Sequence, residues 1–230
     1  MADPQQENKL ENFAWLRAAV LGANDGIVST SSLILGVAAS HAQHSSILIS
    51  GIAGAVSGAL SMAVGEYVSV QSQADSEAAA LKSEHAKIRA NPKDEHQELA
   101  DIYIQRGIES GLAAQVARQL MEHDALGAHA RDELGITGTF SAKPLLAASS
   151  SLASFAAGAS VPLLEALLVP EDALLPVVAV GSLILLMILG AAAARTGGAN
   201  VLRGSLRVGL WSSIAMGISA GVGVLLGGLA

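Results

Sequence analysis

The chain alternates long hydrophobic stretches with one long polar segment. Five stretches are long enough to cross a bilayer, which takes about 20 mostly apolar residues in a helix. They lie near 16–39, 47–70, 144–168, 174–194 and 206–229. The first two are rich in Gly and Ser, which favours close approach of neighbouring membrane helices. The pattern therefore predicts an all-α membrane protein with five transmembrane helices.

The polar segment between the second and third stretches predicts three more helical pieces. The second stretch is expected to continue as helix to Asn91-Pro92, because proline disfavours helical backbone in the preceding residue. Further helices are expected over about 94–106 and about 111–134, ended by Gly107 and Gly135. The predicted organisation is a polar N-terminal segment, a pair of spans, a three-helix acidic domain and three more spans: 1–15, 16–74, 75–143 and 144–230.

Composition agrees with a membrane protein. Hydrophobic residues make up 51% of the chain and charged residues 14%, whereas soluble domains carry about a quarter charged residues. There is no cysteine, which excludes disulfides and thiolate metal sites. The formal net charge is −7 and no basic patch is interleaved with aromatics, so nucleic acid is not an expected partner. The polar first eleven residues lack the order of a signal peptide.

The basic residues predict the orientation. With five spans, one side holds the N-terminus, the 75–143 domain and the 195–205 loop, and all 13 Lys and Arg fall there or at its membrane edge. The other side carries none. Because basic residues concentrate on the cytoplasmic side, the N-terminus and 75–143 are expected in the cytoplasm and the C-terminus outside. We expect a multi-pass protein of a bacterial inner membrane.

Two of the predicted spans carry carboxylates. Asp25 lies in the first, and Glu66 lies in the second, four residues after Met62 and on the same helix face. A charged side chain at membrane depth costs about 2.5–3.5 kcal/mol on insertion scales, and such residues mark ion paths. These residues therefore suggest a cation path. Packing alone remains the plainer interpretation of Met62 and of the glycines around it.

The acids of the polar domain recur at helical spacing. Glu77 and Glu84 are seven apart, Glu95, Glu98 and Asp101 are three apart, and Glu122, His129 and Glu133 are seven and four apart. Carboxylate and imidazole ligands suit Fe, Mn or Zn. A solvated acidic surface is the alternative interpretation of the same spacing.

Three motifs together resemble the vacuolar iron transporter family, and the chain is similar to a bacterial member. They are GANDGIVST in the first span, SMAVGEYVSVQSQ at the end of the second, and AHARDELGI at the end of the polar domain. The resemblance implies a homodimeric exporter of Fe²⁺ and related ions (Mn²⁺, Co²⁺, Zn²⁺), driven by proton antiport, with the path at the dimer interface. It implies no prosthetic group; the partners are the transported metal, protons, membrane lipid and a second copy.

The resemblance also implies site residues. The family's path-lining Asp and Met fall on Asp25 and Met62, and the acid of its GEY motif falls on Glu66. In the polar domain, the family's second-helix acid pair falls on Glu98 and Asp101, and its closing glutamate on Glu133. Where plant-type members have two methionines, this chain has His129 and Ala130, so His129 is a candidate replacement ligand. For the first-helix pair, the nearest acids are Glu77 and Glu84.

Two other functions are considered. A di-iron oxidase built on the polar helices usually needs Glu-x-x-His pairs, and this chain has none. A membrane-anchored protein that binds metal or recruits a partner without transport is the second alternative, but it leaves Asp25 and Glu66 without a role. The sequence therefore predicts a secondary transporter rather than an enzyme.

Overall fold

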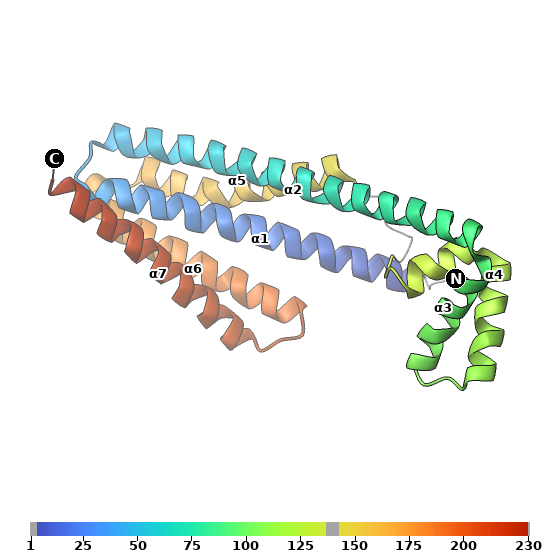
Figure 1. Ribbon diagram of the computed structural model, residues 1–230. Helices are drawn as coiled ribbons and strands as arrows, with labels where there is room; N and C mark the ends of the chain where they lie inside the picture. Colours follow the sequence, from blue (N-terminus) through green and yellow to red (C-terminus); the bar gives the residue numbers. More distant parts are fainter. Residues whose placement is uncertain (1–3, 137–142, 230) are drawn as a thin grey trace. The chain divides into compact units, whose positions relative to one another are not determined.

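The computed structural model describes residues 4–136 and 143–229, and the side chains from residue 19 onward (Figure 1). The first three residues of the predicted polar segment 1–15 lie outside the described residues. The described part is helical and contains no strand. Its helices are α1 Pro4–Ala39, α2 His44–Ala90, α3 Pro92–Gln105, α4 Ser110–Asp132, α5 Pro144–Leu168, α6 Glu171–Thr196 and α7 Val201–Gly227.

Five of the described helices are long and apolar enough to cross a membrane: Ala19–Ala39 within α1, and α2, α5, α6 and α7. The all-α fold with five candidate spans is thus confirmed. Several helices begin before the predicted spans. Helix α1 begins at Pro4, well before the predicted span, and α2 begins at His44. The helix itself is therefore longer than the hydrophobic stretch that it contains.

The chain divides into two compact units, which we call the membrane unit (Met1–Tyr67 with Leu145–Ala230) and the soluble unit (Val68–Pro144). In the membrane unit, glycines bring helices together. A Cβ on Gly158 of α5 would collide with the backbone carbonyl of Ala23 in α1, and a Cβ on Gly26 would collide with that of Phe155. These close approaches need residues without side chains, as predicted for Gly-rich spans.

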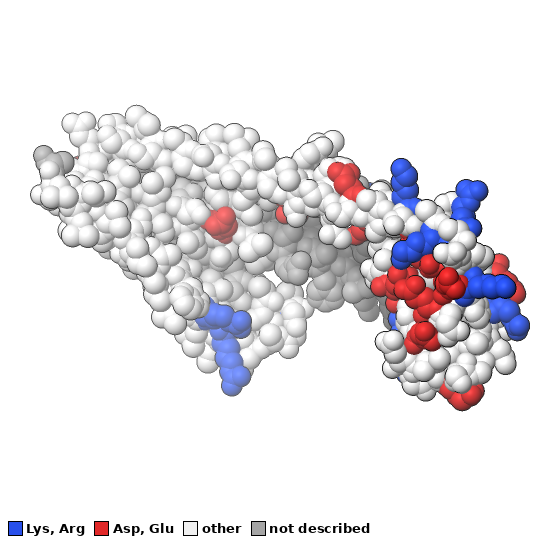
Figure 2. Space-filling view, viewed as in Figure 1, with Lys and Arg blue, Asp and Glu red and all other residues white. Residues whose placement is uncertain are grey.

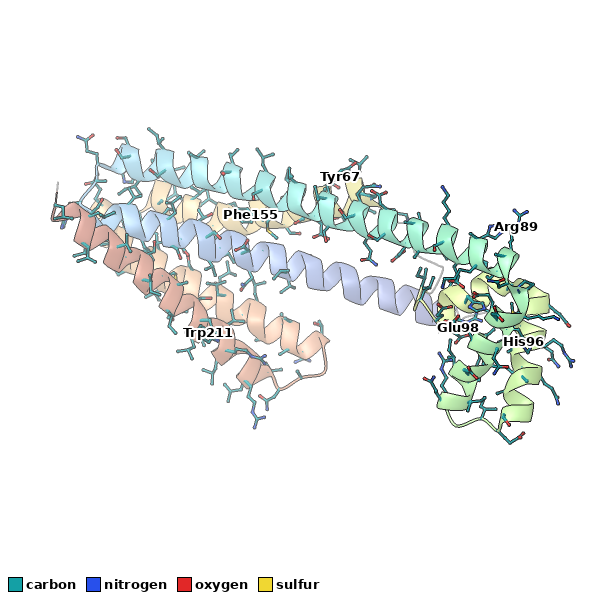
Figure 3. The ribbon with its side chains drawn as sticks, viewed as in Figure 1. Tyr67, Arg89, His96, Glu98, Phe155 and Trp211 are labelled. Carbon is teal, nitrogen blue, oxygen red and sulfur yellow. The ribbon has the colours of Figure 1, made fainter. Side chains whose placement is uncertain are left out.

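Apolar side chains fill the rest of the membrane unit. Ile34, Leu174, Val178 and Met216 are buried in one cluster formed by α1, α6 and α7 with α2 and α5. Phe155, labelled in Figure 3, is buried against Ala55 and Ala59 of α2 in a second cluster. Many apolar residues on the outer faces are exposed, as expected of helices that face lipid.

The soluble unit consists of the end of α2 with α3 and α4, packed around Leu99, Ala100, Ala117 and Ala128. Helix α2 ends at Ala90 and α3 starts with Pro92, so the predicted break at Asn91-Pro92 is confirmed. Gly107 and Gly135 follow α3 and α4 with φ of 95° and 68°, which is left-handed backbone that favours glycine.

One kink in α4 was not predicted. Asp124 has φ −158° and ψ 87°, outside the helical region. Its Oδ1 accepts a hydrogen bond of 3.0 Å from the Gly127 backbone N–H, so the aspartate caps the helix that restarts after it. Short polar side chains compete with the helix backbone in this way. The kink separates the first part of α4 from the turn that carries His129.

Candidate metal centre

Four side chains from three helices converge in the soluble unit. Glu84 comes from α2, Glu95 from α3, His129 from α4 and Glu133 from the residue that ends α4, and each offers a donor atom within 4.8 Å of the others. His129 Nδ1 lies 2.8 Å from Glu133 Oε2, 3.4 Å from Glu84 Oε1 and 3.9 Å from Glu95 Oε2. Ligands at about 2.0–2.2 Å from one ion lie up to about 4.4 Å apart, so small shifts would close these donors around a cation.

Local sequence explains this convergence. The turn at Asn91-Pro92 folds α3 back after α2, which brings the first turn of α3 close to the last turns of α2. Glu95 lies four residues before the fully buried Leu99, so both occupy the inner face of α3. His129 and Glu133 are one helical turn apart. We call Glu84, Glu95, His129 and Glu133 the Glu/His cluster.

The Glu/His cluster is buried and only partly satisfied. The exposed fractions of Glu84, Glu95 and His129 are 1%, 6% and 0%. Glu84 Oε1, Glu95 Oε2 and His129 Nε2 are buried without a hydrogen-bond partner among the described residues. Burying polar atoms without partners costs free energy, and a cation coordinated by Glu84 Oε1 and Glu95 Oε2 would compensate for the cost at these two atoms. The donor set, carboxylates with imidazole, suits Fe²⁺, Mn²⁺ or Zn²⁺.

The pKa values of Glu84 and Glu95 shift in opposite directions. Burial, together with hydrogen bonding to Glu84 and its negative charge, raises the pKa of Glu95. Burial acts on Glu84 in the same direction, but its hydrogen bonds to Lys87 and Glu95 and the charge of Lys87 outweigh it and lower the pKa of Glu84. Two adjacent carboxylates repel each other when both are charged, which drives their pKa values apart. A divalent cation would allow both to ionise.

A lysine borders the Glu/His cluster. Lys87 Nζ donates to Glu84 Oε2 at 2.9 Å and lies 3.6 Å from Glu133 Oε1. These two carboxylates raise the pKa of the lysine, so it is charged. The side chain is 47% exposed and reaches the cluster from the solvent side.

A second polar group fixes the end of α4. Tyr103 Oη donates to Asp132 Oδ2 at 2.9 Å, and the Arg106 guanidinium donates to Asp132 Oδ1 at 2.7 Å and to its carbonyl at 3.2 Å. Arg106 also lies over the Tyr103 ring, 5.3 Å from its centroid. We call Tyr103, Arg106 and Asp132 the α3–α4 latch. Because Asp132 precedes Glu133, the latch holds that turn in place.

An open groove of about 640 Å³ lies beside the latch. It is lined by acidic, amide and apolar side chains: Asp94, Gln97, Glu98, Asp101, Ile102, Gln105, Asp132 and Glu133. Figure 2 shows the acidic side chains gathered on the soluble unit, and Figure 3 labels Glu98. Since Glu133 belongs to both groove and cluster, the acidic groove leads to the cluster.

The structure brings together some of the predicted ligands of the polar domain. Glu84, His129 and Glu133 meet in the Glu/His cluster. Glu98 and Asp101 are exposed and line the groove instead, where Gln97 donates to Asp101 at 2.8 Å. Glu77 is outside the cluster and accepts a hydrogen bond from Gln73.

The sequence prediction did not include Glu95 as a ligand, although it noted the spacing of Glu95, Glu98 and Asp101. The signal that could have identified Glu95 is its four-residue offset from Leu99. That offset places Glu95 on the buried face of α3, whereas Glu98 and Asp101 are exposed.

The predicted site residues of the membrane unit lie in α1 and α2. Asp25 is half-buried in α1, and its Oδ1 accepts a 3.0 Å hydrogen bond from Ser29 Oγ, one turn later. Met62 is half-buried and packs against the cluster formed by Ala55, Ala59, Phe155 and Ala159. Glu66 is half-buried in α2. Among the described residues, no ion pair or hydrogen bond joins Asp25 to Glu66.

Comparison with known proteins places the chain in one family. Residues 16–224 match the VIT family. The chain is 46% identical over 223 residues to "Vacuolar iron transporter" of Acanthamoeba castellanii, covering 96% of this chain and 82% of that protein. It is 38% identical over 221 residues to "Vacuolar iron transporter homolog 1" of Oryza sativa subsp. japonica, covering 96% and 77%. It is 35% identical over 214 residues to "Vacuolar iron transporter homolog 2" of Arabidopsis thaliana, covering 93% and 85%. A family match over residues 16–224, together with relatives that are 35–46% identical over more than nine-tenths of the chain, shows that this protein belongs to the VIT family.

Proposed function

We propose that this chain exports Fe²⁺ and related divalent metals (Mn²⁺, Co²⁺, Zn²⁺) from the cytoplasm in exchange for protons, and that it works as a homodimer. The observation that carries the proposal is the buried Glu/His cluster, in which one oxygen each of Glu84 and Glu95 has no hydrogen-bond partner among the described residues. It occurs in a chain with five helices apolar enough to cross a membrane, related to proteins described as vacuolar iron transporters.

The soluble unit collects the metal. The groove beside the latch presents Asp94, Glu98, Asp101 and Glu133, and a concave surface of one charge raises the local concentration of counter-ions. Glu133 also contacts His129 in the Glu/His cluster. A cation that enters the groove can therefore pass to the buried donors through a carboxylate common to both.

The membrane unit provides the path. Among the residues whose side chains are described, Asp25 accepts a hydrogen bond from Ser29 alone, which leaves carboxylate capacity for a cation. Metal ligands must be deprotonated, so entry of a metal displaces protons and its departure lets them return. That competition is the physical basis for exchange. Met62 supplies a thioether, which favours Fe²⁺ over the harder Mg²⁺ and Ca²⁺, and Glu66 shares its helix face.

Orientation and assembly complete the proposal. The concentration of basic residues on one side supports a cytoplasmic position for the N-terminus and residues 75–143, and with this orientation transport runs out of the cytoplasm in whichever membrane holds the chain. One face of α2 exposes a row of apolar residues at helical spacing, each more than half exposed: Ile49, Ile52, Val56, Leu60 and Val64. A second copy of the chain, with membrane lipid around it, is proposed to cover this face.

The test is Fe²⁺ uptake into proteoliposomes with an acidic interior, monitored together with the internal pH. We expect uptake that is coupled to proton efflux and abolished in Asp25→Asn, while that variant still inserts and elutes like wild type. Asn keeps the size of the side chain and its capacity for a hydrogen bond from Ser29, but it removes the charge.

Two outcomes would contradict the proposal. Metal binding without uptake would favour a membrane-anchored metal-binding protein. Uptake that proceeds normally in a well-expressed Asp25→Asn variant would remove the proposed membrane path.

A further inference from the structure

Lys87 occupies the edge of the Glu/His cluster and has no role in the mechanism above. It lies three residues after Glu84 on α2, so one helical turn brings its ammonium back to that carboxylate. The same ammonium lies 3.6 Å from Glu133, which the chain brings in from the end of α4. Lys87 therefore contacts two of the four donors.

In both Glu84 and Glu133, one carboxylate oxygen lies near Lys87 and the other near His129; we call these the outer and the inner oxygen. In Glu84, Oε2 accepts from Lys87 at 2.9 Å, whereas Oε1 lies 3.4 Å from His129 and has no hydrogen-bond partner. In Glu133, Oε1 is the oxygen near Lys87, and Oε2 lies 2.8 Å from His129. The inner oxygens thus face His129 and the inside of the cluster, while the outer ones face an ammonium.

We propose that Lys87 is a built-in cation that competes with the metal for Glu84 and Glu133, and so weakens metal binding enough for the metal to be passed on. The proposal rests on the metal site assigned above. With Lys87 in place, Glu84 can offer a metal one oxygen without losing its ion pair. Binding through both oxygens requires the ammonium to leave.

Electrostatics gives the direction of the effect. The ammonium offsets part of the negative charge of the metal-free cluster, which would otherwise bury carboxylates without a counter-ion. A divalent metal must enter against that same positive charge, a few ångströms away. Lys87 therefore stabilises the metal-free state and destabilises the metal-bound state, and a transporter gains from a capture site that also releases.

The direction in which metal affinity changes when Lys87 is removed distinguishes competition from a supporting role. If Lys87 only positioned Glu84 and Glu133, its removal would weaken binding. If it competes, its removal strengthens binding. The variant is Lys87→Met, which keeps an unbranched apolar stem of similar length and loses the charge. Two controls are Lys87→Arg, which keeps the charge, and Lys82→Met, which removes an exposed charge from the same helix.

The experiment is titration of the full-length protein in detergent with Mn²⁺ and with Co²⁺. We expect Lys87→Met to bind at least about tenfold more tightly than wild type, which corresponds to about 1.4 kcal/mol. Lys87→Arg should remain near the wild-type affinity. Lys82→Met should stay within about twofold, since the exposed Lys82 forms no ion pair with the cluster among the described residues.

Thermal unfolding gives a second, independent measurement. Without metal, Lys87→Met should melt at a lower temperature than wild type, because the cluster loses its counter-ion. With saturating Mn²⁺, the rise in its melting temperature should exceed that of wild type, because tighter binding stabilises the folded state more.

The failures are distinguishable. If wild type binds metal and Lys87→Met binds it with equal or lower affinity, the proposed competition is wrong but the metal site remains. Binding that is insensitive to Glu84→Gln and Glu133→Gln as well would overturn the metal site and this inference together.

Discussion

The Nδ1 atom of His129 lies 2.8 Å from Oε2 of Glu133, one helical turn further along. Glu133 is the residue that ends α4, and its backbone N–H still donates to the His129 carbonyl at 2.9 Å. The final turn of α4 thus presents an imidazole and a carboxylate as a pair. Glu84 and Glu95 complete the donor set from α2 and α3.

The first prediction concerns Glu95, the donor that the sequence did not identify. Glu95→Gln keeps the shape of the side chain but replaces one oxygen of a buried carboxylate by a hydrogen-bond donor. We expect at least about tenfold weaker binding of Mn²⁺ in calorimetric titration, the size of one charge-assisted contact. Glu122→Gln, at an exposed position of α4 that belongs to neither the groove nor the cluster, is the control. Equal affinities in both variants would exclude Glu95 as a ligand.

The second prediction concerns the α3–α4 latch. Tyr103→Phe removes the hydrogen bond to Asp132 and leaves the ring in place. We expect the free energy of unfolding to fall by about 0.5–1.5 kcal/mol, the net contribution of one such hydrogen bond. The backbone amides of α3 and α4 should then exchange their hydrogens faster than in wild type. Unchanged exchange in both helices would show that the latch does not hold them.

The third prediction gives the latch a pH dependence. Burial alone would raise the pKa of Asp132, but the hydrogen bonds from Arg106 and Tyr103 lower it below the usual 3.8. A lowered folded-state pKa contributes stability above pH 3.8 that is lost as the pH falls through the lowered value. As the pH drops below 3.8, the α3 and α4 amides of wild type should therefore lose more protection from hydrogen exchange than those of Asp132→Asn. Parallel losses in the two proteins would contradict this contribution.

The fourth prediction concerns packing in the membrane unit. A Cβ on Gly158 would meet the backbone carbonyl of Ala23, and backbone cannot rotate away as a side chain can. Gly158→Ala should therefore cost about 1–3 kcal/mol through overpacking and lower the melting temperature in detergent. Gly217→Ala is the matched control, because nothing lies within 4 Å of its added Cβ. If both variants melt like wild type, α1 and α5 do not approach as described.

The fifth prediction separates selectivity from capacity at Met62. Met62→Leu keeps the volume, so the packing against Phe155 should change by less than about 1.5 kcal/mol. Loss of the thioether should reduce Fe²⁺ or Co²⁺ uptake more than Mn²⁺ uptake, because sulfur favours the softer ions. The measurement is competitive uptake of paired metals at one pH gradient. A common reduction for all metals would make Met62 a packing residue.

The sequence predicted features that depend on local chemistry. The break at Pro92, the glycine ends of α3 and α4 and the long apolar helices follow from backbone preferences and hydrophobic length, so they could be placed from the chain alone. The kink at Asp124 arises because its side chain accepts a hydrogen bond from the Gly127 backbone N–H in place of a helical carbonyl. Many aspartates within helices do not do this, so the sequence alone does not predict the kink.

The donor set could be predicted only in part, because a site made by three helices depends on how each is rotated. Glu84, His129 and Glu133 were found from helical spacing and family motifs. Glu95 and Glu98 share the spacing of three, and the burial of Leu99 selects Glu95, which lies four residues before it on the same face of α3. The role of Lys87 was invisible for a similar reason. Its pairing with Glu84 fits any solvated helix, whereas its approach to Glu133 depends on α4.

The most direct test of the central claim, that the Glu/His cluster holds the metal, is anomalous X-ray diffraction from crystals of the full-length protein grown with Mn²⁺. We expect an anomalous peak between Glu84, Glu95, His129 and Glu133, with donor atoms at about 2.0–2.3 Å from it. We also expect this peak to be lost in crystals of Glu84→Gln. A Mn²⁺ peak confined to the groove between Glu98 and Asp101, with none among the four buried side chains, would contradict it.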